Sequence, residues 1–241
     1  MMKILFSCLM YFVTILVVAQ DKIVVEYSYR NTFDTSNVTD AHTLNLYQNS
    51  NEKIFYYTLS IDNHEAVFVD VPRVDNAQEK NKPAISGPIG KSYFNLQTRE
   101  RLDEVNYYGK YIIKDSVNVV EWKIERERGR HLGYETRKAT YKNDYLEYEA
   151  WFVPSLPLNF GPNGYVELPG LIVKFTHYFN HNKSRHKRTF SADKISIVPD
   201  LKLAKPTKGK IISQQEFNAI VDAHKKRCEE VEHQKMETKI D

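Results

Sequence analysis

Apolar and polar residues alternate with a period of two along most of the chain after Lys22. Successive side chains of a β-strand point to opposite faces, so this period predicts strands with one buried face. Strands are predicted at 22–30, 42–48, 53–61, 65–70, 91–98, 107–114, 116–125, 131–142, 145–153, 171–180 and 188–198. Half-buried strands with short connections are typical of antiparallel sheets. The predicted fold is mainly β, a large curved antiparallel sheet or open β-barrel with one C-terminal α-helix.

The same alternation predicts which side chains share a face of a strand. In 145–153 the apolar face holds Leu146, Tyr148, Ala150 and Phe152, and the mixed face holds Tyr145, Glu147, Glu149 and Trp151. In 171–180 the apolar face holds Leu171, Val173, Phe175 and Phe179, and the opposite face holds Ile172, Lys174, Thr176 and Tyr178. The apolar faces are expected to form the core.

Helical periodicity is confined to the end of the chain, where an amphipathic helix is predicted at 213–235, packed on or beside the sheet. Ser213 and Glu216 have the spacing of a capping box. One face of the predicted helix then contains Phe217, Ile220, Val221, His224, Cys228 and Val231 as a stripe. Because Cys228 lies on this stripe, it is expected to be a packed apolar residue rather than a reactive thiol.

The first residues predict export. A short basic start ends at Lys3, residues 4–19 carry no charge, and Val17 and Ala19 supply small side chains before a cleavage point. We therefore expect a signal peptide at 1–19 and an antiparallel β domain at 20–212, ahead of the C-terminal helix. The apolar run is shorter than the roughly 20 residues that cross a bilayer, so no transmembrane span is expected after cleavage. The expected location is the periplasm, the outer membrane surface or the medium.

Composition limits the class of partner. Lys and Arg number 34 against 31 Asp and Glu, a formal charge of +3, which does not favour a nucleic-acid partner. The basic run at 182–188 could bind an anionic glycan or lipid head group, but a solvated hairpin tip is the favoured interpretation. Residues 71–90 are polar with three prolines and predict a long mobile loop.

Motifs for chemistry are absent from the sequence. There is no Gly-x-Ser-x-Gly, Cys-x-x-Cys or His-Glu-x-x-His. His177 and His181 have a spacing that would pair two metal ligands on a helix, but on a strand they lie roughly 13 Å apart. No metal, no cofactor and no catalytic residue is therefore predicted, and a non-enzymatic protein is favoured.

A stiff loop is predicted between the strands at 145–153 and 171–180. Four prolines, at 154, 157, 162 and 169, each fix a φ angle, which lowers the entropy lost when the loop is ordered. Asn163 and Gly164 suit a tight turn with positive φ, and Pro169 followed by Gly170 fits the central pair of a type II turn. The loop is expected to hold one shape.

In this region the chain resembles the GLPGLI family of exported Bacteroidetes proteins, whose function is not established. The segments that carry the resemblance are Gly133–Ala139 (GYETRKA), Ala150–Leu158 (AWFVPSLPL) and Phe160–Phe175 (FGPNGYVELPGLIVKF). Two positions depart from the family pattern: Glu167 replaces the first glycine of the naming motif, and Thr136 replaces a cysteine that is often present. The resemblance implies export and a β fold, and no mechanism.

These observations lead to a binding hypothesis. The protein is expected to bind an apolar or amphipathic small molecule, or an envelope protein, through the sheet face around Trp151 together with the loop at 154–170, since aromatic rings beside polar groups suit ligand contact. The candidate residues are Tyr145, Glu149, Trp151, Pro169, Gly170, Lys174 and Tyr178. Two alternatives stay open: an envelope hydrolase whose site assembles from several strands, and a purely structural domain.

Overall fold

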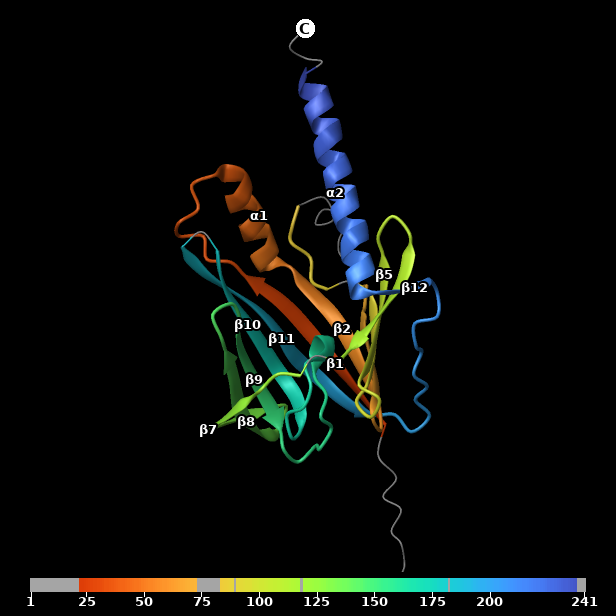
Figure 1. The fold of residues 1–241 in the computed structure, drawn as a ribbon. Coiled ribbons are helices and arrows are strands. Elements are labelled where there is room, and N and C mark those ends of the chain that lie inside the picture. The colour runs from red at the N-terminus through yellow and green to blue at the C-terminus, as the bar shows by residue number, and fades with distance from the viewer. Residues whose placement is uncertain (1–21, 73–82, 89, 118, 182, 238–241) are drawn as a thin grey trace, which may run out of the picture.

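The structure is a computed structural model that describes residues 22–72, 83–88, 90–117, 119–181 and 183–237. Twelve of its elements are strands of one sheet (Figure 1). In chain order they are β1 (Ile23–Thr32), β2 (Ile54–Asp62), β3 (Glu65–Asp70), β4 (Lys91–Asn95), β5 (Glu100–Asn106), β6 (Lys110–Ser116), β7 (Lys123–His131), β8 (Tyr134–Lys142), β9 (Glu147–Val153), β10 (Leu171–His181), β11 (Ser184–Ile197) and β12 (Lys210–Ser213). Their order across the sheet is β12-β6-β5-β4-β3-β2-β1-β11-β10-β9-β8-β7.

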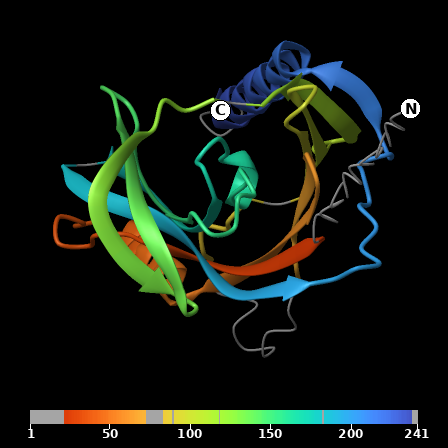
Figure 2. The ribbon, with the colours of Figure 1, turned by 90° about the horizontal axis from the view of Figure 1, so that it is seen from below.

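The predicted fold class, a large curved sheet with a C-terminal helix, is confirmed. Neighbouring strands run antiparallel throughout the described sheet except for β12, which runs parallel to β6. The sheet is therefore mixed, because the segment after β11 returns the chain to the far edge in the direction of β6. β7 and β12 end the strand order and do not pair with each other, so the barrel stays open. Figure 2 shows how strongly the sheet curves around the segment that contains the 3-10 helix η1 (Pro162–Gly164).

A helix replaces one predicted strand. The segment predicted as a strand at 42–48 forms α1 (Ala41–Glu52). Leu44 and Leu46 supplied the period of two, but the side chain of Asp40 caps the helix by accepting a hydrogen bond from the Thr43 amide (2.7 Å). Tyr47 then stacks on Phe33, which follows β1, with ring centroids 4.5 Å apart. Local capping and this one aromatic contact outweigh the alternation.

The C-terminal helix α2 (Gln214–Glu237) starts directly after the predicted capping residue. Ser213 Oγ accepts from the Glu216 amide (3.1 Å), and the Glu216 carboxylate accepts from the Ser213 amide (2.7 Å), so the capping box is present. Phe217 packs on Tyr107 and Tyr111 beside β6. The helix then extends past the end of the sheet (Figure 1). Cys228 is exposed, so its predicted packing is wrong. The apolar stripe of α2 continues beyond the part of the helix that lies against the sheet.

Several strand boundaries also differ from those predicted. The expected strand at 116–125 is mostly a connection between β6 and β7, and β5, β7 and β12 were not predicted. β5 and β7 lack a clean apolar alternation: most of β7 (KIERERGRH) is exposed, and no residue of β5 is fully buried. The predicted signal peptide at 1–19 and most of the predicted loop at 71–90, namely residues 73–82 and 89, lie outside the described residues.

The concave face of the sheet carries the core, and the face assignments for β9 are confirmed. Tyr148, Ala150 and Phe152 are buried. In β10, Ile172 was expected on the outer face, but it is fully buried and lies against Gly161 of the loop. The reason is a register shift between Ile172 and Lys174, where β10 pairs with β9. Such a bulge adds one residue to a strand and turns the side chains before it to the other face.

Candidate functional site

The loop at 154–170 runs inside the curve of the sheet. Its apolar side chains are buried against the concave face: Leu158, Phe160, Val166 and Leu168. The backbone is held along its length, because Phe160 pairs with Val166 in a short bridge and Trp122 Nε1 donates to the Val166 carbonyl (3.1 Å). The η1 turn reaches across to β3 and β4. The loop is thus a buried segment that contacts both halves of the sheet.

The two turns expected in this loop have different outcomes. Asn163 (φ 53°) and Gly164 (φ 79°) both adopt positive φ, and the Tyr165 amide donates to the Pro162 carbonyl, so the tight Asn-Gly turn is confirmed. The type II turn at Pro169-Gly170 is wrong. Gly170 has φ 154°, and its amide donates to the Leu168 carbonyl (2.7 Å), a three-residue turn. Glycine is required there because a Cβ would lie 2.2 Å from the Val153 carbonyl oxygen.

Glu167, which replaces the family's first glycine, has φ 69°. This is the left-handed region that glycine adopts at no steric cost. Its side chain is directed to an ion pair with Arg99 (3.2 Å), itself at φ 56°. A charged residue therefore occupies a backbone position suited to glycine, at the entry to the Leu-Pro-Gly corner.

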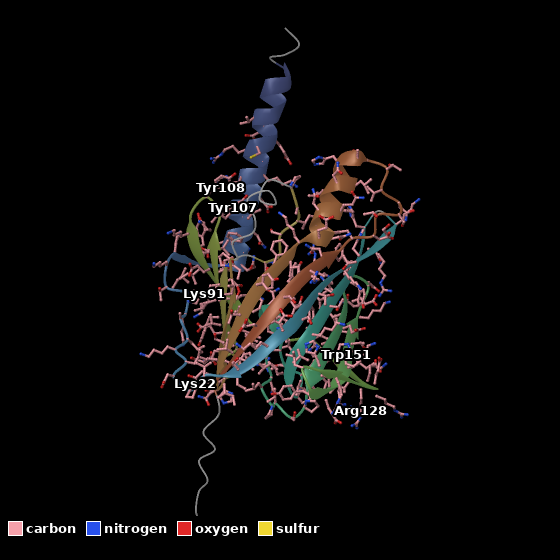
Figure 3. The ribbon with its side chains drawn as sticks, turned by 180° about the vertical axis from the view of Figure 1, so that it is seen from behind. Lys22, Lys91, Tyr107, Tyr108, Arg128 and Trp151 are labelled. Carbon is pink, nitrogen blue, oxygen red and sulfur yellow. The ribbon has the colours of Figure 1, made fainter. Side chains whose placement is uncertain are left out.

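The residues predicted as a binding surface lie mainly on the outer, convex face. We call the outward residues of β8, β9 and β10 the Trp151 face; they are Lys138, Glu147, Glu149, Trp151, Lys174 and Tyr178. Register places Trp151 opposite Lys174 and Glu147 opposite Tyr178. Tyr145 precedes β9 and is 87% exposed. Figure 3 shows Trp151 close to Arg128, at the opposite end of the molecule from Tyr107 and Tyr108 beside α2, so the C-terminal helix does not cover this face.

Three of the four charged side chains on the Trp151 face, those of Lys138, Glu147 and Glu149, form ion pairs. Glu149 accepts from Trp151 Nε1 (3.0 Å) and forms an ion pair with Lys138 (3.2 Å), which also pairs with Glu127 (3.1 Å). These carboxylates raise the pKa of Lys138. Arg185 pairs with Glu147 and lies 4.4 Å from the Tyr178 ring centroid. The face therefore presents partly exposed rings beside carboxylates that are already paired with cations.

The predicted site residues do not form one site. Trp151 and the other members of the Trp151 face lie outside the sheet, whereas the loop packs inside it. Pro169 is exposed and Gly170 is buried at the strand end, where the loop joins β10. The sheet itself separates the two halves of the predicted surface, because neighbouring residues of one strand point to opposite faces.

A pocket lies on the concave side between the loop and the sheet, and we call it the loop pocket. Its volume is about 340 Å³. Its walls are four aromatic rings, two nitrogen-bearing side chains, the turn residue Asn163 and one short segment: Tyr29, Tyr165, Phe175, Phe190, His177, Arg188 and residues 86–88. Tyr165 stacks on Phe175 with centroids 3.6 Å apart. A concave, ring-lined space with a few polar groups has the composition of a small-molecule site.

The segment at 86–88 closes one side of the loop pocket. It is fixed on both sides: Tyr57 Oη donates to the Pro88 carbonyl (2.8 Å), and Asn31 Nδ2 donates to the Ile85 carbonyl (2.9 Å). A Cβ on Gly87 would lie 2.1 Å from Tyr57 Oη, so the backbone is packed directly on the aromatic wall. Burial raises the pKa of Tyr57 and, against the opposing effect of Arg188, that of Tyr29. Both phenols are therefore neutral hydrogen-bonding groups.

His177 and Arg188 are directly opposite each other across β10 and β11. His177 Nε2 and Arg188 Nε are both buried without a hydrogen-bond partner. Burial and the nearby Arg188 charge lower the pKa of His177, so His177 is neutral at pH 7. Since Arg188 is cationic and adjacent to His177, these two side chains are unsuited to binding a metal ion together.

Sequence reasoning did not select the loop pocket. Phe175 and Phe179 were assigned to the inner face, and the same alternation puts His177 there, which is the signal that could have found it. Arg188 was included in the basic run expected to be a solvated hairpin tip. In the structure the run alternates: Arg185 faces outward, whereas His186 is buried and Arg188 lines the pocket. Only the register of β10 with β11 brings His177 and Arg188 together.

Comparisons with known proteins identify the class of fold. The sequence model of a family described as a protein of unknown function (Porph_ging) matches residues 107–174, which is consistent with a Bacteroidetes family. That range covers β6 to the start of β10, including the loop. No curated protein sequence matches the chain. Within the described residues, no helix is long and apolar enough to cross a membrane.

Two solved structures of PNGF-II share the fold. The structure in the C2 space group has a TM-score of 0.53 and 16% identity, and the match covers 83% of this chain and 32% of that one. The structure in the P21 space group has a TM-score of 0.51 at 16% identity, with 81% and 32% covered. This chain thus corresponds to about a third of the PNGF-II chain. At this identity the likeness extends to the fold alone.

Proposed function

We propose that the protein is an exported, non-enzymatic binding protein of the GLPGLI type, and that it holds a small amphipathic molecule in the loop pocket. The observation that carries the proposal is the pocket itself, in which four rings surround two buried nitrogens that have no partner. A ligand would gain apolar contact from the rings and hydrogen bonds from the nitrogens. Small-molecule sites commonly combine an apolar lining with a few polar groups in this way.

The loop supports this proposal because it supplies part of the pocket in a fixed position. Tyr165 and Asn163 come from the η1 turn, and the turn is held by packing against β3 and β4. A wall that is ordered before binding lowers the entropy cost of association. Export rests on the leader pattern of residues 1–19 and on the family resemblance around the Leu-Pro-Gly corner.

The test uses a neutral amphipathic probe, 2-naphthalenemethanol, titrated into the full mature chain by isothermal calorimetry. Ser86→Trp places a large ring at the pocket wall and should lower the affinity by roughly tenfold or more, because it occupies the space of the probe. Ser155→Trp is the matched control, since Ser155 is exposed and lines a different depression. Binding that Ser86→Trp leaves unchanged, or no binding by the unaltered chain, would contradict the proposal.

A partner protein on the Trp151 face is the second candidate. It is favoured by Tyr145, 87% exposed, next to a partly exposed Trp151, since exposed aromatic residues are enriched at interfaces. Purification of the full chain from the envelope fraction, followed by mass spectrometry, tests it. A partner that is retained by the unaltered chain and by Ser86→Trp, and lost with Trp151→Ala, would support this candidate. Retention by Trp151→Ala would exclude it.

A further inference from the structure

Arg188 is the group in the loop pocket with the strongest need for a partner. Its Nε is buried and unpaired, and the lining of the pocket includes no aspartate or glutamate. One face of the guanidinium rests 4.6 Å from the Phe179 ring centroid, which leaves the in-plane N–H groups to be satisfied. A partly buried cation without an anion is costly, because desolvation is not offset by an opposite charge.

Two other partly buried cations of the described chain have such a partner. Arg101, whose side chain is 21% exposed, donates Nε to Asp103 (2.7 Å). Lys138, 20% exposed, pairs with two carboxylates. Arg188 differs from both, because its Nε is buried without a partner and its side chain lines a pocket that has no acid. This difference indicates that a ligand in the loop pocket supplies the negative charge that Arg188 lacks within the protein.

His177 adds a second hydrogen-bonding group at the same place. It lies opposite Arg188 in the register, so the two side chains stand side by side on the concave face. A neutral imidazole can donate one N–H to an oxygen acceptor, and Arg188 can donate two N–H groups to a carboxylate in a bidentate pair. The pocket then holds one full positive charge, which matches a singly charged carboxylate better than a phosphate ester, which carries about −1.5 to −2 at pH 7.

We infer that the loop pocket binds a small carboxylic acid with an apolar, ring-sized body, whose carboxylate is held by Arg188 and His177 and whose body lies between Tyr165 and Phe190. The inference rests on the proposed function and specifies its ligand class. Tyr29 and Phe175 complete the apolar walls, so the acid group and the body meet different parts of one pocket.

Four probes with one common ring system test this inference by calorimetry: 2-naphthoate, 2-naphthalenemethanol, 2-naphthylmethylammonium and 2-naphthyl phosphate. We expect 2-naphthoate to bind at least about tenfold more tightly than the alcohol, and the ammonium to bind most weakly, because a charge-assisted hydrogen bond is worth about twice a neutral one. Tighter binding of the phosphate than of 2-naphthoate would overturn the carboxylate assignment.

Two variants of β11 form a matched pair. Arg188→Met should lower the affinity for 2-naphthoate by about 10- to 100-fold and change the affinity for the alcohol by less than about threefold. Arg185→Met removes the same charge three residues away on the outer face, and should leave both affinities unchanged. Circular dichroism confirms that each variant folds, and Arg188→Lys, which keeps the charge, should retain part of the preference for 2-naphthoate.

The two proposals fail in different ways. If the alcohol binds as tightly as 2-naphthoate, or if Arg188→Met binds 2-naphthoate normally, the carboxylate inference is wrong and the pocket remains an apolar binding site. If none of the four probes binds the unaltered chain, the proposed function fails together with the inference.

Discussion

The loop pocket and the Trp151 face use similar residues in opposite ways. Each combines aromatic rings with a β11 arginine that lies over a ring, Arg188 on Phe179 inside and Arg185 on Tyr178 outside. On the outer face the arginine also has a carboxylate partner, Glu147. In the pocket Arg188 has none, and the neighbouring His177 also has an unpaired nitrogen. Residue type alone does not distinguish the two regions.

The state of the polar groups does distinguish them. A network that is already satisfied gains little from a ligand, because each new contact must replace an existing one. Buried groups that have lost water without gaining a partner carry a cost, and a ligand with complementary groups removes it. Unpaired polar atoms in a ring-lined hollow therefore mark a binding site better than a mixture of aromatic and charged residues does.

The largest predicted difference between the two regions is in packing. Phe160→Ala should lower the free energy of unfolding by about 3–5 kcal/mol, because the side chain is 1% exposed between the loop and the sheet. Trp151→Ala should cost only about 1 kcal/mol, since the ring is half-buried on the outer face. Equilibrium urea unfolding of both variants measures this. Equal losses would show that the Trp151 face is a second core.

The next largest predicted difference in the free energy of unfolding concerns the backbone at the Leu-Pro-Gly corner. Gly170→Ala should cost about 3 kcal/mol, because φ is 154° and the new Cβ would meet the Val153 carbonyl oxygen. The matched control is Gly133→Ala in the β7–β8 turn beside the outer face. Gly133 also has positive φ (83°) but nothing within 4 Å of a new Cβ, so about 1 kcal/mol is expected. Urea midpoints that fall equally would mean that the corner is not closely packed.

A charge substitution should change stability in opposite directions in the two regions. Arg188→Met should raise the free energy of unfolding by about 1 kcal/mol, because it removes a cation that is partly buried without an acid. Lys138→Met should lower it by at most about 1 kcal/mol, since its two ion pairs are near the surface. Thermal unfolding at pH 7.5 in a ligand-free sample compares them. A loss of stability in Arg188→Met would point to a partner for Arg188 within the protein itself.

Much of this architecture was accessible from the sequence because it depends on local rules. The alternation of Tyr148, Ala150 and Phe152 fixed the inner face of β9, the Asn163-Gly164 pair fixed the turn, and Ser213 with Glu216 fixed the start of α2. In each case the cause acts within a few residues. Two local features are exceptions. In α1, Leu44 and Leu46 mimic a strand and the Asp40 cap decides, and Pro169-Gly170 forms a three-residue turn instead of a type II turn.

The candidate site was less accessible because it depends on register and on curvature. His177 and Arg188 are eleven positions apart and meet only because β10 and β11 pair as they do. The bulge at Ile172 moved one predicted outer residue inside. The curvature of the sheet encloses the segment that contains η1 (Figure 2). None of these follows from residue types or from a period of two.

The smallest predicted effect concerns the pH dependence of stability in the pocket. The pKa of His177 is lowered in the folded protein by burial and by Arg188 on β11; the other groups packed against it are the rings of Tyr148 on β9 and Phe179 on β10. An unfolded histidine has a pKa of about 6.5, so below that pH the unfolded chain binds a proton that the folded chain resists. The free energy of unfolding should therefore decrease as pH falls from about 7 toward the lowered folded pKa.

The variant His177→Gln isolates this effect from that of the other histidines. The loss of stability between pH 7.5 and pH 5.5, measured by urea unfolding, should be smaller in His177→Gln than in the unaltered chain. His181→Gln is the matched control, because His181 is exposed at the end of the same strand. If His177→Gln and the unaltered chain lose stability in parallel, the folded protein does not resist protonation of His177, and the lowered pKa of this side chain is wrong. The contrast with the ion-paired outer face would then rest on Arg188 alone.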